Sequence, residues 1–204
     1  MTARLDQQFA FLNEADRLKS VLRATTLCDG SRRENSGEHS WHLALYAMVL
    51  ADQAGLDVDL SRVIRMLILH DLVEIDVGDV PIHSKGGTAH ASAETVAAEA
   101  RAADRIFGLL PPDLGRDFHA LWDEFEAAET PDAVFAKSLD RAQPVMANLL
   151  SGGGSWVEYA VTQAQLDDRV GSKIARGTLN LWPYIRQTVA PWFARHRPGG
   201  NARN

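Results

Sequence analysis

The chain has 204 residues, enough for one domain whose hydrophobic core is stable without a bound metal ion. Its 21 basic and 27 acidic residues give a formal net charge of −6, which argues against a protein that coats nucleic acid. No run approaches the roughly 20 apolar residues of a membrane span, and the N-terminal residues do not resemble a secretion signal. The single cysteine, Cys28, excludes an internal disulfide. We therefore expect a cytoplasmic protein without nucleic-acid or membrane partners.

Apolar residues recur mostly at intervals of three and four, which predicts an all-α fold without a half-buried strand. The expected helices span about 6–27, 36–54, 60–76, 92–108, 112–128 and 131–150, with one or two more within about 156–195. Gly55 follows an expected helix end, and Pro112 and Pro131 stand at expected first turns. These positions support the predicted bounds.

Two expected helices have distinctive apolar patterns. In the first helix, Phe9, Leu12 and Leu22 share a side with Leu18 or Ala15, which we expect to be its packed face. The helix at about 60–76 is hydrophobic nearly all round, which predicts a buried position at the centre of the fold.

The chain shows no strong composition shift, so we expect one main domain over residues 1–150. Residues 151–197 are expected to form a helical extension packed on the same domain, and 198–204 a disordered tail. The run Ser151-Gly-Gly-Gly-Ser155 predicts a flexible break between them. Pro183 and Pro191 are expected to interrupt the helices of the extension.

Three ionisable residues, His70, Asp71 and Glu74, lie in the most apolar of the expected helices. Burying unpartnered charges costs several kcal/mol each, so something must compensate. A divalent cation bound by His70 and Asp71 would do so, with Glu74 one turn further along the same face as His70. A polar network that closes between core helices would also explain these residues.

Two further residues extend the metal hypothesis. His39 lies near the start of the preceding expected helix, which an antiparallel arrangement would bring toward His70. Asp140 interrupts an otherwise apolar helix. Two imidazoles and two carboxylates would form a mixed nitrogen and oxygen site that leaves positions for water.

In this order and spacing, His39, His70-Asp71 and Asp140 resemble the HD-domain superfamily of metal-dependent phosphohydrolases. The strings Glu34-Asn-x-x-Glu-His39, His70-Asp-Leu-Val-Glu74 with Val77-Gly-Asp79, and Lys137-x-x-Asp140 resemble its 5′-deoxynucleotidase branch. The resemblance implies a compact helical bundle that binds one divalent ion (Mn²⁺, Co²⁺, Fe²⁺, Zn²⁺ or Mg²⁺) through His39, His70, Asp71 and Asp140. It also implies that the protein is a homodimer.

The resemblance further implies roles around that ion. Glu74 matches a catalytic carboxylate that orients or deprotonates the attacking water, Asp79 an acid that contacts the sugar, and Arg23 an arginine of the substrate pocket. His42 is interpreted as a packing or supporting residue. His83 and Lys85 could approach the mouth of the substrate site.

The expected reaction is release of phosphate from (deoxy)nucleoside 5′-monophosphates through a metal-bound water. The sequence departs from the deoxynucleotidase pattern after Arg23, where Ala24-Thr25-Thr26 replaces a tryptophan that helps to exclude the ribose 2′-hydroxyl. Thr26 could bond a hydroxyl instead. Hydrolysis of another phosphorylated small molecule, such as a phosphodiester or a pyrophosphate, and a non-catalytic metal or nucleotide sensor are the alternatives.

Overall fold

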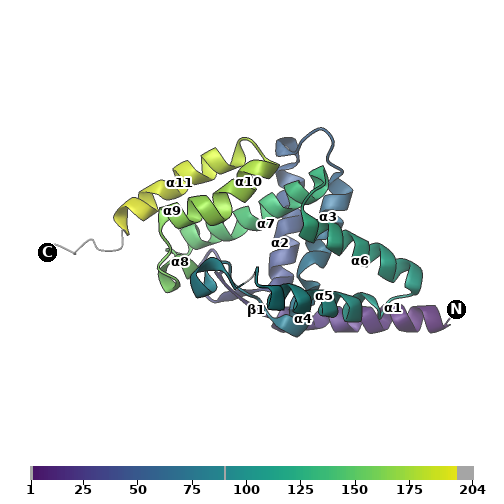
Figure 1. The fold of residues 1–204 in the computed structure, drawn as a ribbon. Helices are drawn as coiled ribbons and strands as arrows, with labels where there is room; N and C mark the ends of the chain where they lie inside the picture. Colours follow the sequence, from purple (N-terminus) through teal and green to yellow (C-terminus); the bar gives the residue numbers. More distant parts are fainter. Residues whose placement is uncertain (1, 90, 197–204) are drawn as a thin grey trace.

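The computed structural model describes residues 2–89 and 91–196 of the chain. Within these ranges the fold is helical except for one two-stranded sheet, so the expected all-α class is confirmed (Figure 1). The expected tail at 198–204 and the side chain of Lys85 lie outside what is described.

The elements follow one another in a single pass along the chain. The helices are α1 (Thr2–Ala15), α2 (Ser36–Val49), α3 (Leu60–Leu69), α4 (Glu74–Val77), α5 (Ala93–Phe107), α6 (Pro112–Ala127), α7 (Pro131–Leu150), α8 (Ser155–Glu158), α9 (Gln163–Leu166), α10 (Ser172–Gly177) and α11 (Leu181–Arg195). The strands are β1 (Leu22–Thr26) and β2 (Arg33–Asn35). Short 3-10 turns cover Asp16–Ser20, Ala51–Gln53, His70–Val73 and Ser84–Gly87, and a π turn covers Asp167–Gly171.

The helices α5, α6 and α7 begin and end close to their predicted bounds because local signals fix their termini. The side chain of Ser92 accepts a hydrogen bond from the backbone N–H of Thr95 at the start of α5. Thr130 does the same for Ala133 at the start of α7. Prolines occupy the first turns of α6 and α7, where a missing N–H costs nothing.

The predicted helix at 6–27 is wrong in its second half. Helix α1 ends at Ala15, and β1 pairs antiparallel with β2, so that Leu22 lies opposite Asn35. This sheet turns Arg23 toward the interior, where only 9% of its surface is exposed. The predicted apolar face is wrong at Phe9 and Leu12, which are 60% and 58% exposed, whereas Leu18 is buried as expected and Phe11 is buried as well.

The predicted continuous helix at 60–76 is also wrong. Helix α3 ends at Leu69, a tight 3-10 turn follows, and α4 ends at Val77, before Gly78, whose φ of +74° suits glycine. Nor is α3 buried all round, since Ile68 is 44% exposed. The change of helix type at His70 places His70 and Asp71 in a turn between two helices and Glu74 at the start of the second helix.

The segment Ser151–Ser155, predicted as a flexible break, forms a hydrogen-bonded turn between α7 and α8. The side-chain oxygen of Asn148 accepts hydrogen bonds from both the backbone N–H and the hydroxyl of Ser155. Gly153 allows the turn to approach Trp192, because an added Cβ would lie 2.2 Å from that ring. Prolines Pro183 and Pro191 both lie inside α11 and do not interrupt it, contrary to expectation.

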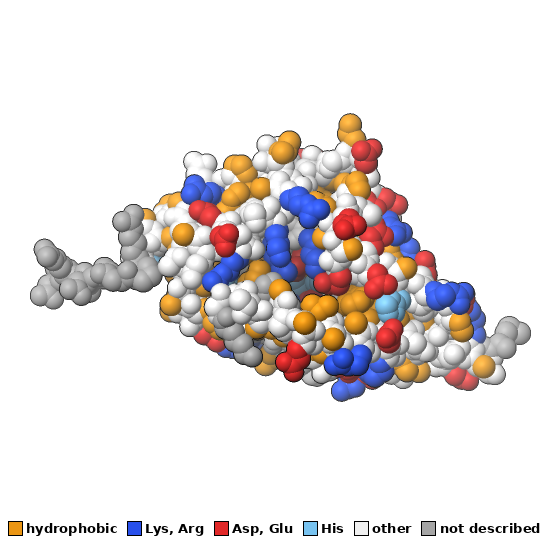
Figure 2. All heavy atoms as spheres, in the orientation of Figure 1, with side chains coloured by type: hydrophobic (Ala, Val, Ile, Leu, Met, Phe, Trp, Pro, Cys, Tyr) orange, Lys and Arg blue, Asp and Glu red, His pale blue; other side chains and the backbone are white. Residues whose placement is uncertain are grey.

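Two groups of buried side chains meet along α7. The larger group fills the space between α2, α3, α5, α6 and α7, and the smaller one surrounds Trp156, Trp192 and Phe193. Helix α10 packs along α7. Figure 2 shows a hollow in the middle of one face, with Lys and Arg side chains gathered around it. Among the described helices, none is long and apolar enough to cross a bilayer.

Candidate functional site

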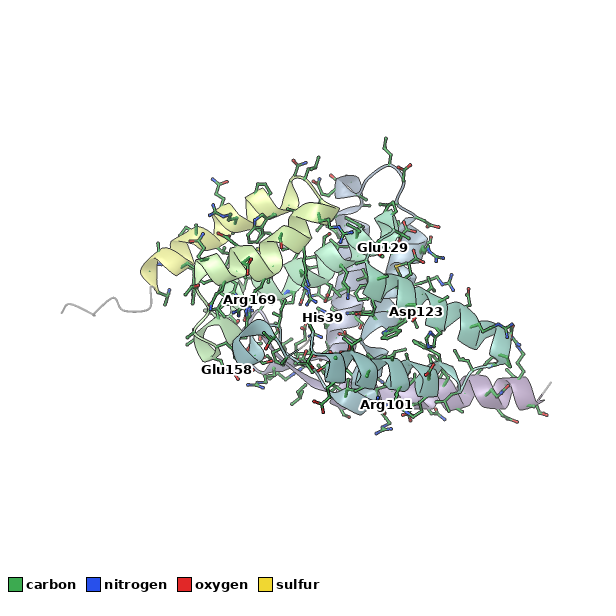
Figure 3. The ribbon with its side chains drawn as sticks, viewed as in Figure 1. His39, Arg101, Asp123, Glu129, Glu158 and Arg169 are labelled. Atoms are coloured by element: carbon green, nitrogen blue, oxygen red, sulfur yellow. The ribbon has the colours of Figure 1, made fainter. Side chains whose placement is uncertain are left out.

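The four predicted metal ligands lie close together at one buried position in the protein. His39 comes from the first turns of α2, and His70 and Asp71 come from the 3-10 turn after α3. One ligand atom from each of these three lies within 4.8 Å of the others. Asp140 of α7 adds an oxygen that lies 3.2 Å from His39 Nε2 and 3.7 Å from His70 Nε2. Figure 3 shows His39 at the centre of the molecule, where these elements converge.

Both histidines turn one ring nitrogen toward this point. His70 Nδ1 lies 2.9 Å from the carbonyl oxygen of Leu67 and donates to it. His70 Nε2 lies 2.9 Å from Asp71 Oδ1, yet it is buried and makes no hydrogen bond with any described residue. A buried nitrogen that faces two carboxylates without bonding them is suited to a cation, because metal-bound histidines hold their other nitrogen in this way.

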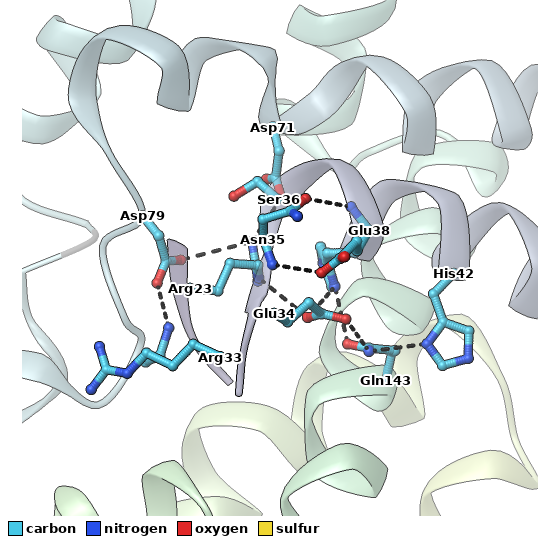
Figure 4. A network of polar contacts seen from close by, with 12 residues as sticks. Arg23, Arg33, Glu34, Asn35, Ser36, Glu38, His42, Asp71, Asp79 and Gln143 are labelled. Carbon is cyan, nitrogen blue, oxygen red and sulfur yellow. Dashed lines mark hydrogen bonds and ion pairs between the residues drawn. The ribbon is translucent and has the colours of Figure 1, made fainter. Parts of the chain in front are cut away.

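His39 is oriented by Gln143, a residue that the sequence did not single out. Its Nδ1 lies 3.0 Å from Gln143 Oε1, which leaves Nε2 to face Asp140. The Gln143 amide in turn donates to Glu34 Oε1 at 2.9 Å and lies 3.2 Å from His42 Nδ1, as Figure 4 shows. His42 therefore lies within hydrogen-bonding distance of the amide that contacts His39. The signal for Gln143 was its place one turn after Asp140 on α7.

Arg23 lies among four carboxylates beside this point (Figure 4). Its Nη1 is 2.7 Å from Asp71 Oδ2, 3.6 Å from Glu74 Oε1 and 3.7 Å from Asp79 Oδ1, and its Nε is 3.8 Å from Glu34 Oε2. Burial opposes the charge of the guanidinium, but the surrounding acids raise the pKa of Arg23 further above its already high value. The side chain therefore stays cationic.

The carboxylates nearest the histidines stay charged. Burial alone would raise the pKa of Asp71, but His70 and Arg23 lower it. Burial likewise opposes ionisation of Asp140, and Arg141 together with the two histidines holds its pKa well below the usual range. Burial would lower the pKa of His70, but Asp71 and Asp140 raise it to about 10. The site therefore attracts positive charge, which a proton or a divalent ion can supply.

The pKa values of Glu74 and Asp79 shift in the opposite direction, upward. Burial, with help from Asp71 and Asp79, raises the pKa of Glu74 well above its ordinary value. The hydroxyl of Ser36 donates to Glu74 Oε2 and fixes its direction. Burial also raises the pKa of Asp79, whose Oδ2 accepts the backbone N–H of Ala24 at 3.1 Å. Glu74 is thus a carboxyl group able to take up a proton beside the histidine pair.

Comparison with known proteins identifies the family. The HD domain matches residues 15–182, which is most of the chain. The chain belongs to the HD-domain family. A solved structure described as a predicted metal-dependent phosphohydrolase from Magnetospirillum magnetotacticum is 45% identical, with a TM-score of 0.87, and the match covers 95% of this chain and 97% of that one.

Curated relatives of this HD-domain protein are more distant. Human 5′-deoxynucleotidase HDDC2 is 29% identical over 143 residues, which cover 67% of this chain and 64% of the human protein. The chain therefore spans slightly less than two thirds of that relative. The 5′-deoxynucleotidase yfbR of Photorhabdus temperata is 27% identical over 169 residues, which cover 80% of this chain and 84% of that protein.

A cavity of about 80 Å³ adjoins the candidate site of this HD-domain protein. Its walls include Arg23, Asp79, Asp140 and His83. The threonine on its wall is Thr25 and not Thr26. The residues directly after Arg23, Ala24 to Leu27, are not aromatic, but Trp156 and Tyr159 line the same cavity from the segment that begins with α8.

The contact between Gln143 and His39 leads to a testable expectation. Gln143→Leu keeps the volume but removes the acceptor for His39 Nδ1 and the donor to Glu34. We expect affinity for Mn²⁺ or Co²⁺ to fall about 10- to 100-fold, the usual effect of losing a partner that orients a ligand. Calorimetric titration measures this, with Gln165→Leu as a control outside the site. Unchanged affinity in Gln143→Leu would show that His39 needs no orientation.

Proposed function

We propose that this protein is a metal-dependent phosphomonoester hydrolase that releases phosphate from nucleoside 5′-monophosphates. The observation that carries the proposal is the convergence of His39, His70, Asp71 and Asp140, with Glu74 beside them. His70 Nε2, buried without a hydrogen bond, and the charged carboxylates around it fit a divalent ion. The names of the relatives support the same reaction.

The proposed roles follow from these positions. His39, His70, Asp71 and Asp140 would hold the ion, which would offset charge on the phosphoryl oxygens and promote ionisation of a bound water. Glu74, held by Ser36, takes the proton of the attacking water. Arg23 keeps the carboxylates of Asp71 and Glu74 in place and adds positive charge beside the phosphate.

The sugar is proposed to lie near Asp79, in the cavity that Thr25 and Tyr159 line. The Thr25 hydroxyl offers a hydrogen bond, whereas the tryptophan of the deoxynucleotidase pattern would offer a steric barrier. We therefore propose that the protein hydrolyses ribonucleotides and deoxyribonucleotides alike.

The ion is proposed to be one of Mn²⁺, Co²⁺, Fe²⁺, Zn²⁺ or Mg²⁺, since mixed imidazole and carboxylate ligands suit all of them. We further propose a cytoplasmic homodimer. Large apolar side chains exposed along α2, namely Trp41, Leu45, Met48 and Val49, support a self-association surface. Light scattering would give the mass of the assembly.

Hydrolysis of dAMP and AMP at equal concentration tests the proposal. With saturating Mn²⁺ or Co²⁺, we expect phosphate release from both, with kcat/KM values within about tenfold of each other, a difference of about 1.4 kcal/mol. A chelator should abolish both reactions. Absence of phosphate release from a panel of nucleoside monophosphates, in protein shown to contain metal, would refute the proposal.

A further inference from the structure

A second cavity, of about 340 Å³, lies between α5, the end of α6, α7 and α10. Four basic side chains line it: Lys137 and Arg141 on α7, and Lys173 and Arg176 on α10. Members of each pair are three or four residues apart, so each pair shares one helix face.

Acidic groups compensate only part of this charge. Lys137 Nζ is bound to Glu126 at 2.8 Å and lies 4.0 Å from the centre of the Phe125 ring. The other acid on the wall is Glu99, and burial together with the neighbouring Glu126 raises its pKa to about 7. Near neutral pH, Arg141, Lys173 and Arg176 therefore outweigh a carboxyl group that is partly protonated.

Two of these three cations have no ion pair among the described residues, and the third has only a long one. Among the described residues, Lys173 and Arg176 form no ion pair within 4.0 Å, and Arg141 Nη1 approaches Asp140 Oδ2 only to 3.7 Å. Arg141 Nε is buried without an acceptor. Burial, followed by the charges of Arg141 and Lys137, lowers the pKa of Lys173. Holding like charges together in this way is unfavourable unless an anion joins them.

The basic cavity adjoins the candidate metal site. Arg141 directly follows Asp140 and lines both this cavity and the one beside Arg23 and Asp79. In a chain with a net charge of −6, these residues form a local positive field next to the proposed reaction centre.

We propose that Arg141, Lys173 and Arg176 form a binding site for a phosphate group distinct from the one that is hydrolysed. Guanidinium groups suit phosphate oxygens because they present two N–H groups side by side, and lysine adds a compact charge. The phosphate is either a second phosphate group of a doubly phosphorylated nucleotide or free inorganic phosphate. This inference rests on the proposed function only because it takes the adjacent metal site as the place of hydrolysis. Phosphate binding in the basic cavity can be measured whether or not that function is correct.

The test is calorimetric titration of the metal-loaded protein with inorganic phosphate at low salt. We expect the double variant Lys173→Gln with Arg176→Gln to bind phosphate at least about tenfold more weakly than wild type, because two charges of the site are lost. Lys173→Arg keeps the charge and should keep the affinity. Arg195→Gln, an exposed position on α11, is the matched control and should not change it.

The variant Asp71→Asn separates this inference from the proposed function. It disrupts the candidate metal site, yet it should retain the phosphate binding that the double variant loses. Equal phosphate affinity, within about twofold, in wild type and the double variant would overturn the inference, whatever the enzyme hydrolyses.

Kinetics with the metal-loaded protein distinguish the two sources of phosphate. The ratio of kcat/KM for a nucleoside 3′,5′-bisphosphate to that for the 5′-monophosphate should fall about tenfold in the double variant if the substrate supplies the second phosphate. An unchanged ratio, together with the calorimetric loss, would assign the cavity to inorganic phosphate.

Discussion

Asp71→Asn is expected to lose its divalent ion and at least about three orders of magnitude in kcat/KM, because the ion and the water it activates provide most of the acceleration in such hydrolases. Asp71 Oδ1 lies 2.9 Å from His70 Nε2, and its Oδ2 bonds Arg23 at 2.7 Å. The amide keeps the shape but not the charge, so it cannot neutralise a cation between the two histidines. Elemental analysis after dialysis against Mn²⁺, together with phosphate release, measures both losses.

A matched control is Asp57→Asn, an exposed carboxylate in the loop before α3. It should bind one ion per chain and hydrolyse substrate like the wild type. Metal addition should also raise the melting temperature of wild type and of Asp57→Asn, but not that of Asp71→Asn, because binding to the folded state alone stabilises it. Full metal occupancy in Asp71→Asn would rule out Asp71 as a ligand.

Glu74→Gln is expected to give the second large effect, a fall in kcat of about 10²- to 10⁴-fold with metal content unchanged. The amide can still accept the hydrogen bond from Ser36, but it cannot take a proton from water. Burial and the nearby acids raise the pKa of Glu74, so its active, deprotonated form is lost as the pH falls through that raised value. Wild-type kcat should therefore rise with pH over this range, and the residual activity of Glu74→Gln should lack that rise.

The surface variant Glu129→Gln serves as the control, since Glu129 is exposed after α6. It should keep both the rate and the pH profile of wild type. If Glu74→Gln instead lost its metal, Glu74 would be a ligand and not a proton acceptor. If it kept full activity, another group would have to accept the proton.

The sequence correctly predicted those parts of the fold that nearby residues determine. The termini of α5, α6 and α7 follow from serine and threonine caps and from prolines in first turns. His70 and Asp71 stood out because ionisable residues in an apolar run need compensation, and His39 and Asp140 because their spacing resembles a known pattern.

The parts that the sequence did not predict depend on pairing between distant segments. Strand β1 forms because β2 pairs with it. Its five residues have no clear strand pattern, so the sequence does not indicate this pairing. The 3-10 turn at His70 contacts α2, α5 and α6, which are distant in the sequence, so local residues alone do not indicate it. Gln143 is an ordinary polar residue in the sequence, and only the packing of α7 brings its amide to His39 and Glu34.

The basic cavity is a further example of such dependence. Lys137 and Arg141 belong to one helix and Lys173 and Arg176 to another, and they share a cavity only because α10 packs along α7. From the sequence alone, each pair would be interpreted as part of a charged, solvent-exposed helix face.

Anomalous diffraction from crystals grown with Mn²⁺ tests the central claim most directly. The expected result is one strong peak per chain, about 2.0–2.3 Å from His39 Nε2, His70 Nε2 and an oxygen of Asp71 and of Asp140, the usual lengths of such metal bonds. A peak elsewhere in the molecule, or no peak at this point in protein that hydrolyses nucleotides, would contradict the assignment of these four residues.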